Sequence, residues 1–174
     1  DGAQEAAREM TAAHPDRYYY ADQYRNDANW QAHYQGTALE ILRDAPQVTH
    51  FVAGLGTTGT FTGTGRRLKA EKPGIWLTAL QPDFALHGLE GWKHLETALV
   101  PAIYDPTLAD EVVEVGTAEA YEMVALAWKH EGLQLSPSAA ANLAGAIRVA
   151  ERLESGTVVT VLADNADKYE EVIK

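Results

Sequence analysis

Residues 50–65 read HFVAGLGTTGTFTGTG. The run begins as a buried strand, continues as a loop of glycines and hydroxyl side chains, and then becomes a helix. Glycines let the backbone turn tightly and bring several N–H groups close to one anion. The following helix adds the positive end of its dipole, and Thr57, Thr58 and Thr60 can each donate a hydroxyl. The stretch therefore predicts a cup for a phosphate group.

Two other interpretations of the same loop are weaker. Residues 54–59 match the dinucleotide pattern G-x-G-x-x-G, but a nicotinamide site also needs an acidic residue at the end of the next strand. That strand ends at Gln81 and Pro82, and Asp83 lies beyond the proline. No lysine follows the loop as it does in a P-loop. A tight glycine turn without a ligand remains the alternative.

The composition is that of one globular domain. The chain has 174 residues, 46% hydrophobic and 22% charged, with a net charge of −11. This acidity argues against a nucleic-acid or anionic-membrane surface, and no apolar run reaches the length of a membrane span. We expect no nucleic-acid or membrane partner, and a cytoplasmic location. The chain has no cysteine, which excludes disulfides and thiol nucleophiles, and it begins without Met, so we expect it to be a piece of something longer.

Apolar spacing and breaker residues divide the rest of the chain into expected elements. Strands are expected at residues 18–20, 47–53, 75–80, 112–115 and 157–163. Helices are expected at 3–13, 29–42, 59–72, 117–132, 138–153 and from about 165 towards 172. The expected buried stripe of the second helix is Trp30, His33, Tyr34, Thr37 and Ile41. Thr117 is expected to cap its helix, and residues 83–110 show no clear periodicity.

Strands that are apolar on both faces alternate here with helices. This alternation predicts an α/β fold with a mainly parallel sheet and helices on both faces. In such sheets ligands bind at the carboxyl ends of the strands, which is where the glycine loop lies.

Other residues with chemical potential are fewer. Ser136-Pro-Ser138 precedes an alanine-rich helix, where a serine can serve as a cap or can face a ligand. A neutral hydroxyl beside a pyridine nitrogen would leave that nitrogen unprotonated. The six histidines lack metal-ligand spacing, so we expect each to be structural or exposed and predict no metal site.

Several motifs together resemble one family. Nearly end to end, the chain resembles the C-terminal half of a cysteine synthase of B type, an O-acetylserine or O-phosphoserine sulfhydrylase. That enzyme belongs to the pyridoxal-phosphate-dependent fold type II family, which is similar to the tryptophan synthase β chain. The resemblance rests on QYRNDAN at 23–29, GTTGT at 56–60, GTGR at 63–66, VPAIYD at 100–105, the run 131–138, and LADN at 162–165.

The resemblance implies an organisation and a site. Residues 1–28 would be the tail of the N-terminal domain, and residues 29–174 the C-terminal domain that binds the cofactor phosphate. The cofactor would be pyridoxal 5'-phosphate. Its phosphate would be held by Gly56, Thr57, Thr58, Gly59 and Thr60, its ring nitrogen would meet Ser138, and the substrate would meet Gln23 and Lys93. Lys93 has the alternative of being an exposed loop lysine.

The resemblance also implies a reaction and a missing part. The complete enzyme would catalyse β-replacement on O-acetylserine or O-phosphoserine with sulfide or a thiocarboxylate donor. Its expected partners are a small-molecule amino-acid substrate and a second copy of itself in a homodimer. The family's Schiff-base lysine lies in a motif that this sequence lacks, so no catalytic residue is assigned here, and a missing N-terminal half or companion chain is expected. The alternatives are another fold type II enzyme (cystathionine β-synthase, threonine synthase or serine dehydratase), a non-catalytic binding partner, or a nicotinamide-binding domain.

Overall fold

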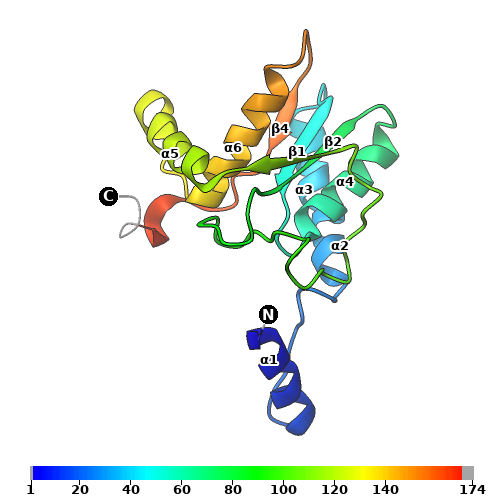
Figure 1. Ribbon diagram of the computed structural model, residues 1–174. Coiled ribbons are helices and arrows are strands. Elements are labelled where there is room, and N and C mark those ends of the chain that lie inside the picture. The colour runs from blue at the N-terminus through cyan, green and yellow to red at the C-terminus, as the bar shows by residue number, and fades with distance from the viewer. Residues whose placement is uncertain (1, 170–174) are drawn as a thin grey trace.

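The computed structural model describes residues 2–169 and contains a single four-stranded sheet (Figure 1). Every pair of neighbouring strands is parallel, and their order is β3-β2-β1-β4. The strands are β1 His50–Gly54, β2 Trp76–Pro82, β3 Glu111–Val115 and β4 Val158–Thr160. The predicted α/β fold with a parallel sheet is confirmed.

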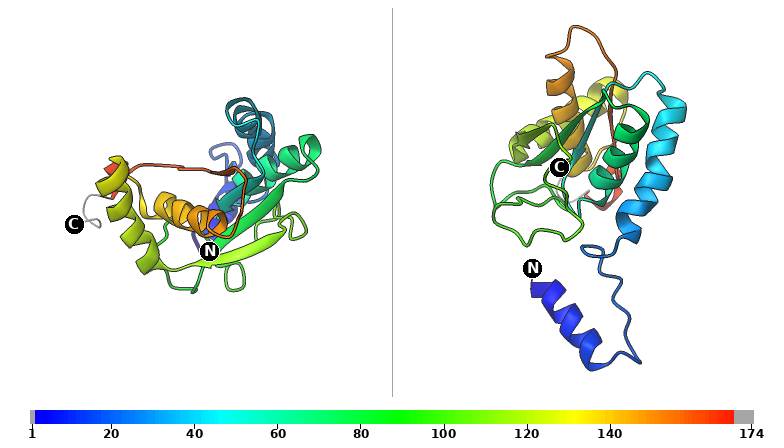
Figure 2. Two further views of the ribbon diagram at one scale, coloured as in Figure 1. Left: turned by 90° about the horizontal axis from the view of Figure 1, so that it is seen from above. Right: turned by 90° about the vertical axis from the view of Figure 1, so that its right-hand side faces the viewer.

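Helices cover both faces of this sheet. They are α1 Gly2–Ala13, α2 Ala28–Gln35, α3 Thr37–Asp44, α4 Gly59–Glu71, α5 Thr117–Glu131 and α6 Pro137–Ala150, followed by the 3₁₀ turn η1 Ala166–Lys168. Seen from above, α5 and α6 lie on one side of the sheet, and α2, α3 and α4 lie on the other (Figure 2). Within the described residues no helix is both long and apolar enough to cross a bilayer.

The central strand β1 contributes side chains to a separate hydrophobic core on each face of the sheet. Phe51 is fully buried and stacks on Phe61 of α4, with ring centroids 6.3 Å apart. Its neighbour Val52 lies in the opposite core, together with Val149 of α6. Because successive side chains of a strand point to opposite faces, a strand covered on both sides must be apolar throughout. This requirement explains the apolar run that precedes the glycine loop.

Three local expectations were wrong. Residues 18–20 form no strand, because they lie in the connection after α1 with no sheet edge to pair with, and Tyr19 is 86% exposed. The helix expected at 29–42 is two helices, since Gly36 leaves the helical conformation at φ −113° and ψ −84°. The cap of α5 is Gly116 and not Thr117, whose hydroxyl accepts from the Gly88 N–H instead.

The irregular segment 83–110 contains no helix or strand, as expected. It crosses the carboxyl edge of the sheet, where the Lys93 N–H donates to the Leu55 carbonyl at 2.7 Å. At the other end of the chain, Asn165 caps η1 by accepting from the Asp167 N–H. The helix expected from about residue 165 was wrong in its described part, because η1 is a 3₁₀ turn that ends at Lys168. The rest of that expected helix, beyond Tyr169, lies outside the described residues.

Helix α1 stands apart from the rest of the molecule (Figures 1 and 2). None of its residues is buried. An ion pair between Arg8 and Asp22, 3.1 Å long, connects it to the segment that leads into α2. Helix α2 has no fully buried residue either, and the buried core begins at Ala38 of α3.

Helices α2 and α4 approach each other closely at Gly63. A Cβ atom on Gly63 would lie 2.0 Å from the Trp30 carbonyl oxygen and 2.8 Å from the His33 Cβ. Because the first of these neighbours is backbone, it cannot move away without displacing α2. The glycine therefore sets the distance between the two helices.

We predict that Gly63→Ala lowers the free energy of unfolding by about 2 kcal/mol, since overpacking of this kind outweighs the helix propensity of alanine, which is worth about 1 kcal/mol. Urea unfolding measures the change. Gly74→Ala is the matched control, because its Cβ would meet no atom within 4 Å. Equal stability of the two variants would contradict the close approach.

Candidate functional site

A pocket of about 480 Å³ opens at the carboxyl ends of the strands. Its walls come from the loop after β1, the first turns of α6, residues 90–92 and the segment around Gln23. The predicted phosphate loop and Ser138 therefore line one cavity, although they are far apart in sequence.

The loop after β1 presents backbone donors at the start of α4. The first hydrogen bond of this helix runs from the Thr62 N–H to the Thr58 carbonyl at 2.8 Å. Within the described residues, the N–H groups of Gly56, Thr57, Thr58 and Thr60 have no acceptor. Unpartnered N–H groups at a helix N-terminus form an anion site, and the helix dipole adds to it.

The Thr57 hydroxyl already accepts two hydrogen bonds. Its Oγ1 lies 3.0 Å from the Asn29 Nδ2 and 3.3 Å from the Gly59 nitrogen, and both of these groups donate to it. Because both lone pairs are engaged, the hydroxyl hydrogen is left to donate into the pocket.

Thr58 is strained and lacks a partner. Its φ is 73°, which a β-branched residue rarely adopts. Its side chain is 2% exposed, and its hydroxyl has no hydrogen-bond partner within the described residues. A buried hydroxyl left unpaired costs about 1–3 kcal/mol, so this atom is a reason to expect a ligand that accepts from it.

Thr60, in the first turn of α4, contacts a histidine. The Thr60 Oγ1 lies 3.2 Å from the His33 Nε2, and the His33 Nδ1 lies 2.9 Å from the Thr37 Oγ1. Burial lowers the pKa of His33 below its ordinary value, so the ring is neutral near pH 7. The expectation that every histidine is structural or exposed overlooked this contact, for which the sequence gives no signal.

A second helix N-terminus faces the pocket from the other side. Ser136 caps α6 by accepting from the Ala139 N–H at 3.1 Å, and its own hydroxyl donates to the Asp164 carboxylate. Ser138 lines the pocket, and its Oγ lies 3.3 Å from the Ser136 Oγ. Because the Ser136 proton is engaged by Asp164, Ser138 is the donor whenever that contact forms.

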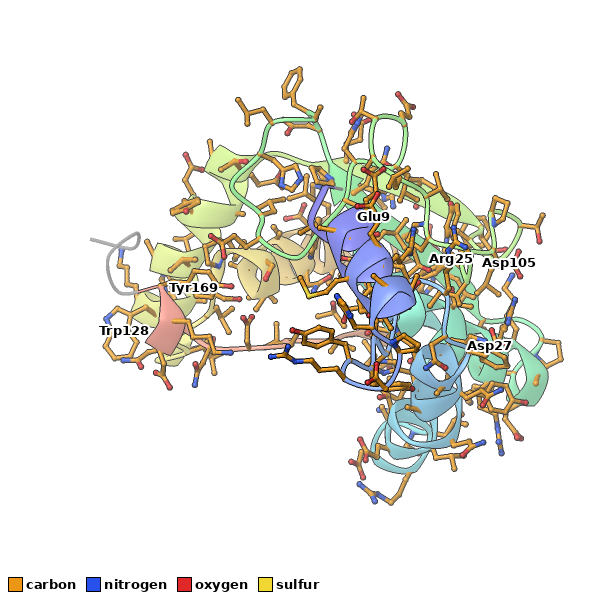
Figure 3. All side chains as sticks on the ribbon, turned by 90° about the horizontal axis from the view of Figure 1, so that it is seen from below. Glu9, Arg25, Asp27, Asp105, Trp128 and Tyr169 are labelled. Atoms are coloured by element: carbon orange, nitrogen blue, oxygen red, sulfur yellow. The ribbon has the colours of Figure 1, made fainter. Side chains whose placement is uncertain are left out.

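The Asp164 carboxylate is held from two directions. The Tyr169 hydroxyl donates to its second oxygen at 3.4 Å. Burial, together with the nearby Asp164 charge, raises the pKa of Tyr169 and keeps it protonated as a donor. Figure 3 shows the molecule from below, with Tyr169 on the side of α5 and α6 and Arg25 on the opposite side.

Two contacts fix the end of β1. The Gly54 N–H donates to the Asn142 Oδ1 of α6 at 2.7 Å. On the pocket side the Trp92 ring lies so close to Gly54 that a Cβ there would be 2.2 Å from it. Asn142 and Trp92 both line the pocket, and sequence reasoning missed both.

The two expected substrate residues are placed differently. Gln23 lines the pocket, and its carbonyl accepts from the Asn29 side chain at 2.7 Å. Lys93 is adjacent to the lining but not part of it, and its Nζ lies 5.1 Å from the centre of the Tyr24 ring. Tyr24 itself lines the pocket, so the Lys93 ammonium lies beside a ring of the pocket wall.

The charges in the lining are negative. Among the described residues the pocket wall contains the carboxylates of Glu90 and Asp164 but no lysine or arginine. No group of three or more His, Cys, Asp or Glu residues in residues 2–169 has the arrangement of a metal site. An anion in this pocket would therefore be bound by neutral donors and helix dipoles.

Comparison with known proteins identifies relatives. A family model described as "Pyridoxal-phosphate dependent enzyme" matches residues 1–164. The chain is 41% identical to a cysteine synthase of Aquifex aeolicus over 97% of its own length and 53% of the relative's. It is 32% identical to cysteine synthase B of Escherichia coli, over 97% of this chain and 55% of that one.

A solved structure is similarly close. The O-acetylserine-dependent cystathionine β-synthase of Helicobacter pylori superposes with a TM-score of 0.89 at 30% identity, over 98% of this chain and 57% of that one. The chain thus spans about half the length of the curated relatives it matches.

We predict that Thr58→Gly stabilises the ligand-free protein by about 1 kcal/mol while weakening phosphate binding. Relief of the positive φ and of the unpaired hydroxyl exceeds the flexibility cost of glycine. Urea unfolding with and without inorganic phosphate measures both effects through the stabilisation that a ligand confers. Thr57→Gly is the control for the effect on stability, because Thr57 is not at positive φ and its replacement by glycine should destabilise the ligand-free protein. A destabilised Thr58→Gly protein would show that the strain is absent.

Proposed function

The chain belongs to the family of pyridoxal-phosphate-dependent enzymes, and on that premise we propose that it forms the cofactor-phosphate-binding part of a cysteine synthase. The reaction proposed for the complete enzyme is β-replacement on O-acetylserine or O-phosphoserine, with sulfide or a thiocarboxylate as sulfur donor. The observation that carries this proposal is the loop of unpartnered donors after β1, within a chain similar to cysteine synthases along 97% of its length.

The cofactor of this family is pyridoxal 5'-phosphate, and the pocket residues fit it. The unpaired Thr58 hydroxyl and the free N–H groups of the loop suit its phosphate. We propose that Gly56, Thr57, Thr58, Gly59 and Thr60 hold that group. A dianion bound at a helix N-terminus needs no neighbouring cation, which agrees with the absence of basic side chains from the described part of the pocket wall.

We propose that Ser138 meets the ring nitrogen. Its hydroxyl lies at the start of α6 in the same pocket, and its protein contact is the neutral Ser136 hydroxyl. When bound, the cofactor supplies an electron-withdrawing ring beside the substrate's α-carbon. The Ser138 hydroxyl would donate to a neutral ring nitrogen, which has a lone pair and no hydrogen, by turning its O–H from Ser136 to the ring.

The substrate side of the pocket is formed by the irregular segment and by Gln23. We propose that the Gln23 amide binds the substrate carboxylate, since its side chain lies beside the pocket and carries two donors. Trp92 lines the same pocket and lies against Gly54 at the end of β1. For Lys93 to bind a substrate phosphate, its ammonium would have to move from the Tyr24 ring into the cavity.

We propose that the catalytic amine is not supplied by this chain. None of the described lysines lines the pocket. Lys69 is paired with Asp110 at 2.8 Å, and the Lys72 ammonium donates to the Pro46 carbonyl. Lysine catalysis requires an amine at the reacting centre. A lysine from a companion chain, or from further sequence of the same protein, would meet this need.

The proposal includes a division of the chain into two domains. We propose that residues 1–28 belong with the N-terminal domain and residues 29–174 with the cofactor domain, because α1 has no buried residue and stands apart. A cytoplasmic homodimer is proposed on the family resemblance alone.

A second candidate function follows from the comparisons. The similar Helicobacter pylori structure is named a cystathionine β-synthase that depends on O-acetylserine. The same scaffold therefore serves a different sulfur nucleophile at comparable similarity. Product analysis of the complete enzyme with sulfide and with homocysteine, in parallel, distinguishes cysteine from cystathionine formation.

We predict that the pure 174-residue chain forms no cysteine from O-acetylserine and sulfide when pyridoxal phosphate is added, because the required amine is missing. Chromatographic detection of cysteine is the measurement. The same sample should still bind inorganic phosphate, followed by tryptophan fluorescence, which controls for folding. Cysteine formation above the level of cofactor alone would refute the proposal.

We predict that Ser138→Ala shifts the absorption spectrum of the bound cofactor and slows the complete enzyme about tenfold. A tenfold change corresponds to the loss of roughly one hydrogen bond to the ring. Ser155→Ala is the control, because Ser155 is exposed and distant from the pocket lining. An unchanged spectrum and rate would remove Ser138 from the site.

A further inference from the structure

The described pocket wall contains no lysine or arginine, so the affinity of the phosphate loop for a phosphate would depend on the direction in which each hydroxyl points. The Thr57 direction is set, because its oxygen accepts from both Asn29 and Gly59. The Thr58 hydroxyl has no competing partner. The direction of the third hydroxyl, on Thr60, depends on a histidine outside the pocket lining.

His33 lies between two threonine hydroxyls. Its Nε2 is 3.2 Å from the Thr60 Oγ1, and its Nδ1 is 2.9 Å from the Thr37 Oγ1. The ring is half-buried and burial lowers its pKa, so it is neutral and carries one N–H. Its Cβ packs at the Gly63 close approach between α2 and α4, which restricts ring movement.

The two tautomers have opposite effects on Thr60. With the proton on Nδ1, the ring donates to Thr37 and Nε2 accepts the Thr60 proton, so Thr60 presents only lone pairs to the pocket. With the proton on Nε2, the ring donates to Thr60 and Nδ1 accepts from Thr37. The Thr60 hydroxyl is then free to donate to an anion, and the chain of hydrogen bonds strengthens that donor.

We propose that His33 is a positioning residue for the phosphate ligand: Thr37 donates to its Nδ1, and its Nε2–H donates to Thr60, so that the Thr60 hydroxyl points at the phosphate. This inference rests on the proposed function, because it assumes a phosphate in the loop. It assigns a ligand-binding task to a side chain that does not line the pocket.

The tautomer can be measured directly in the unmutated protein. Nitrogen-15 NMR of histidine-labelled protein distinguishes a protonated Nε2 from a protonated Nδ1. With inorganic phosphate bound, we expect His33 as the neutral Nε2–H form. A neutral Nδ1–H form in the bound state would overturn the proposal, whatever the behaviour of the variants.

Variants test the consequence for affinity. His33→Phe keeps a ring of similar shape but removes both nitrogens, and should weaken binding of inorganic phosphate and of pyridoxal phosphate about tenfold. Pyridoxal, which lacks the phosphate, should bind as it does to the unmutated protein. His33→Gln restores a donor near the Nε2 position and should recover most of the affinity. His130→Gln, an exposed histidine of α5, is the matched control.

A double variant separates positioning from packing. If His33 acts through Thr60, then His33→Phe should cost no further phosphate affinity in a Thr60→Val background. Independent losses, or equal loss of pyridoxal binding, would show a packing role and overturn the inference. If His33→Phe does not fold, the NMR measurement on the unmutated protein decides.

The test also separates this inference from the proposed function. If the unmutated protein binds neither phosphate nor pyridoxal phosphate, the proposed function fails and the positioning role falls with it. If the unmutated protein binds both and His33→Phe binds them equally well, only the positioning role fails.

Discussion

The hydrogen bond from the Gly54 N–H to the Asn142 Oδ1, 2.7 Å long, joins the two parts of the molecule on which the pocket depends. It fixes the end of the central strand against α6, and α4 begins only a few residues further along the chain. The N-termini of both helices consequently converge on one cavity. Together with the packing of Val52 on Val149, that hydrogen bond fixes the phosphate loop relative to the Ser138 hydroxyl, which comes from the helix on the opposite face of the sheet.

The proposed binding of an anion in the pocket depends on geometry and not on net charge. The protein carries a net charge of −11, and the described pocket wall adds two carboxylates and no basic side chain. Binding therefore relies on helix dipoles, unpaired N–H groups and hydroxyls, whose contributions depend strongly on direction. On this proposal, the positive φ and the unpaired buried hydroxyl of Thr58 both lower the stability of the empty loop, and the hydroxyl is a donor for the ligand.

The relatives define how far the scaffold determines the chemistry. Proteins named cysteine synthase and cystathionine β-synthase match this chain along nearly its whole length, which is about half of theirs. The shared part contains the strand, the loop and the two helix N-termini. If the proposed function holds, the choice of sulfur nucleophile depends on pocket-lining residues such as Trp92 or on sequence beyond this half.

The sequence alone determined the fold class, the glycine loop between β1 and α4 and the serine at the start of α6, because these depend on local patterns: apolar runs, clustered glycines and a helix cap. That the loop binds a phosphate stays a prediction. It also placed most helices and strands, but not the break at Gly36 or the absence of a strand at residues 18–20, where pairing and packing decide. The contacts of His33, Asn142 and Asp164 follow only from the tertiary structure. These residues act on partners many positions away, and no local pattern records which hydroxyl or N–H a folded chain brings within hydrogen-bond distance.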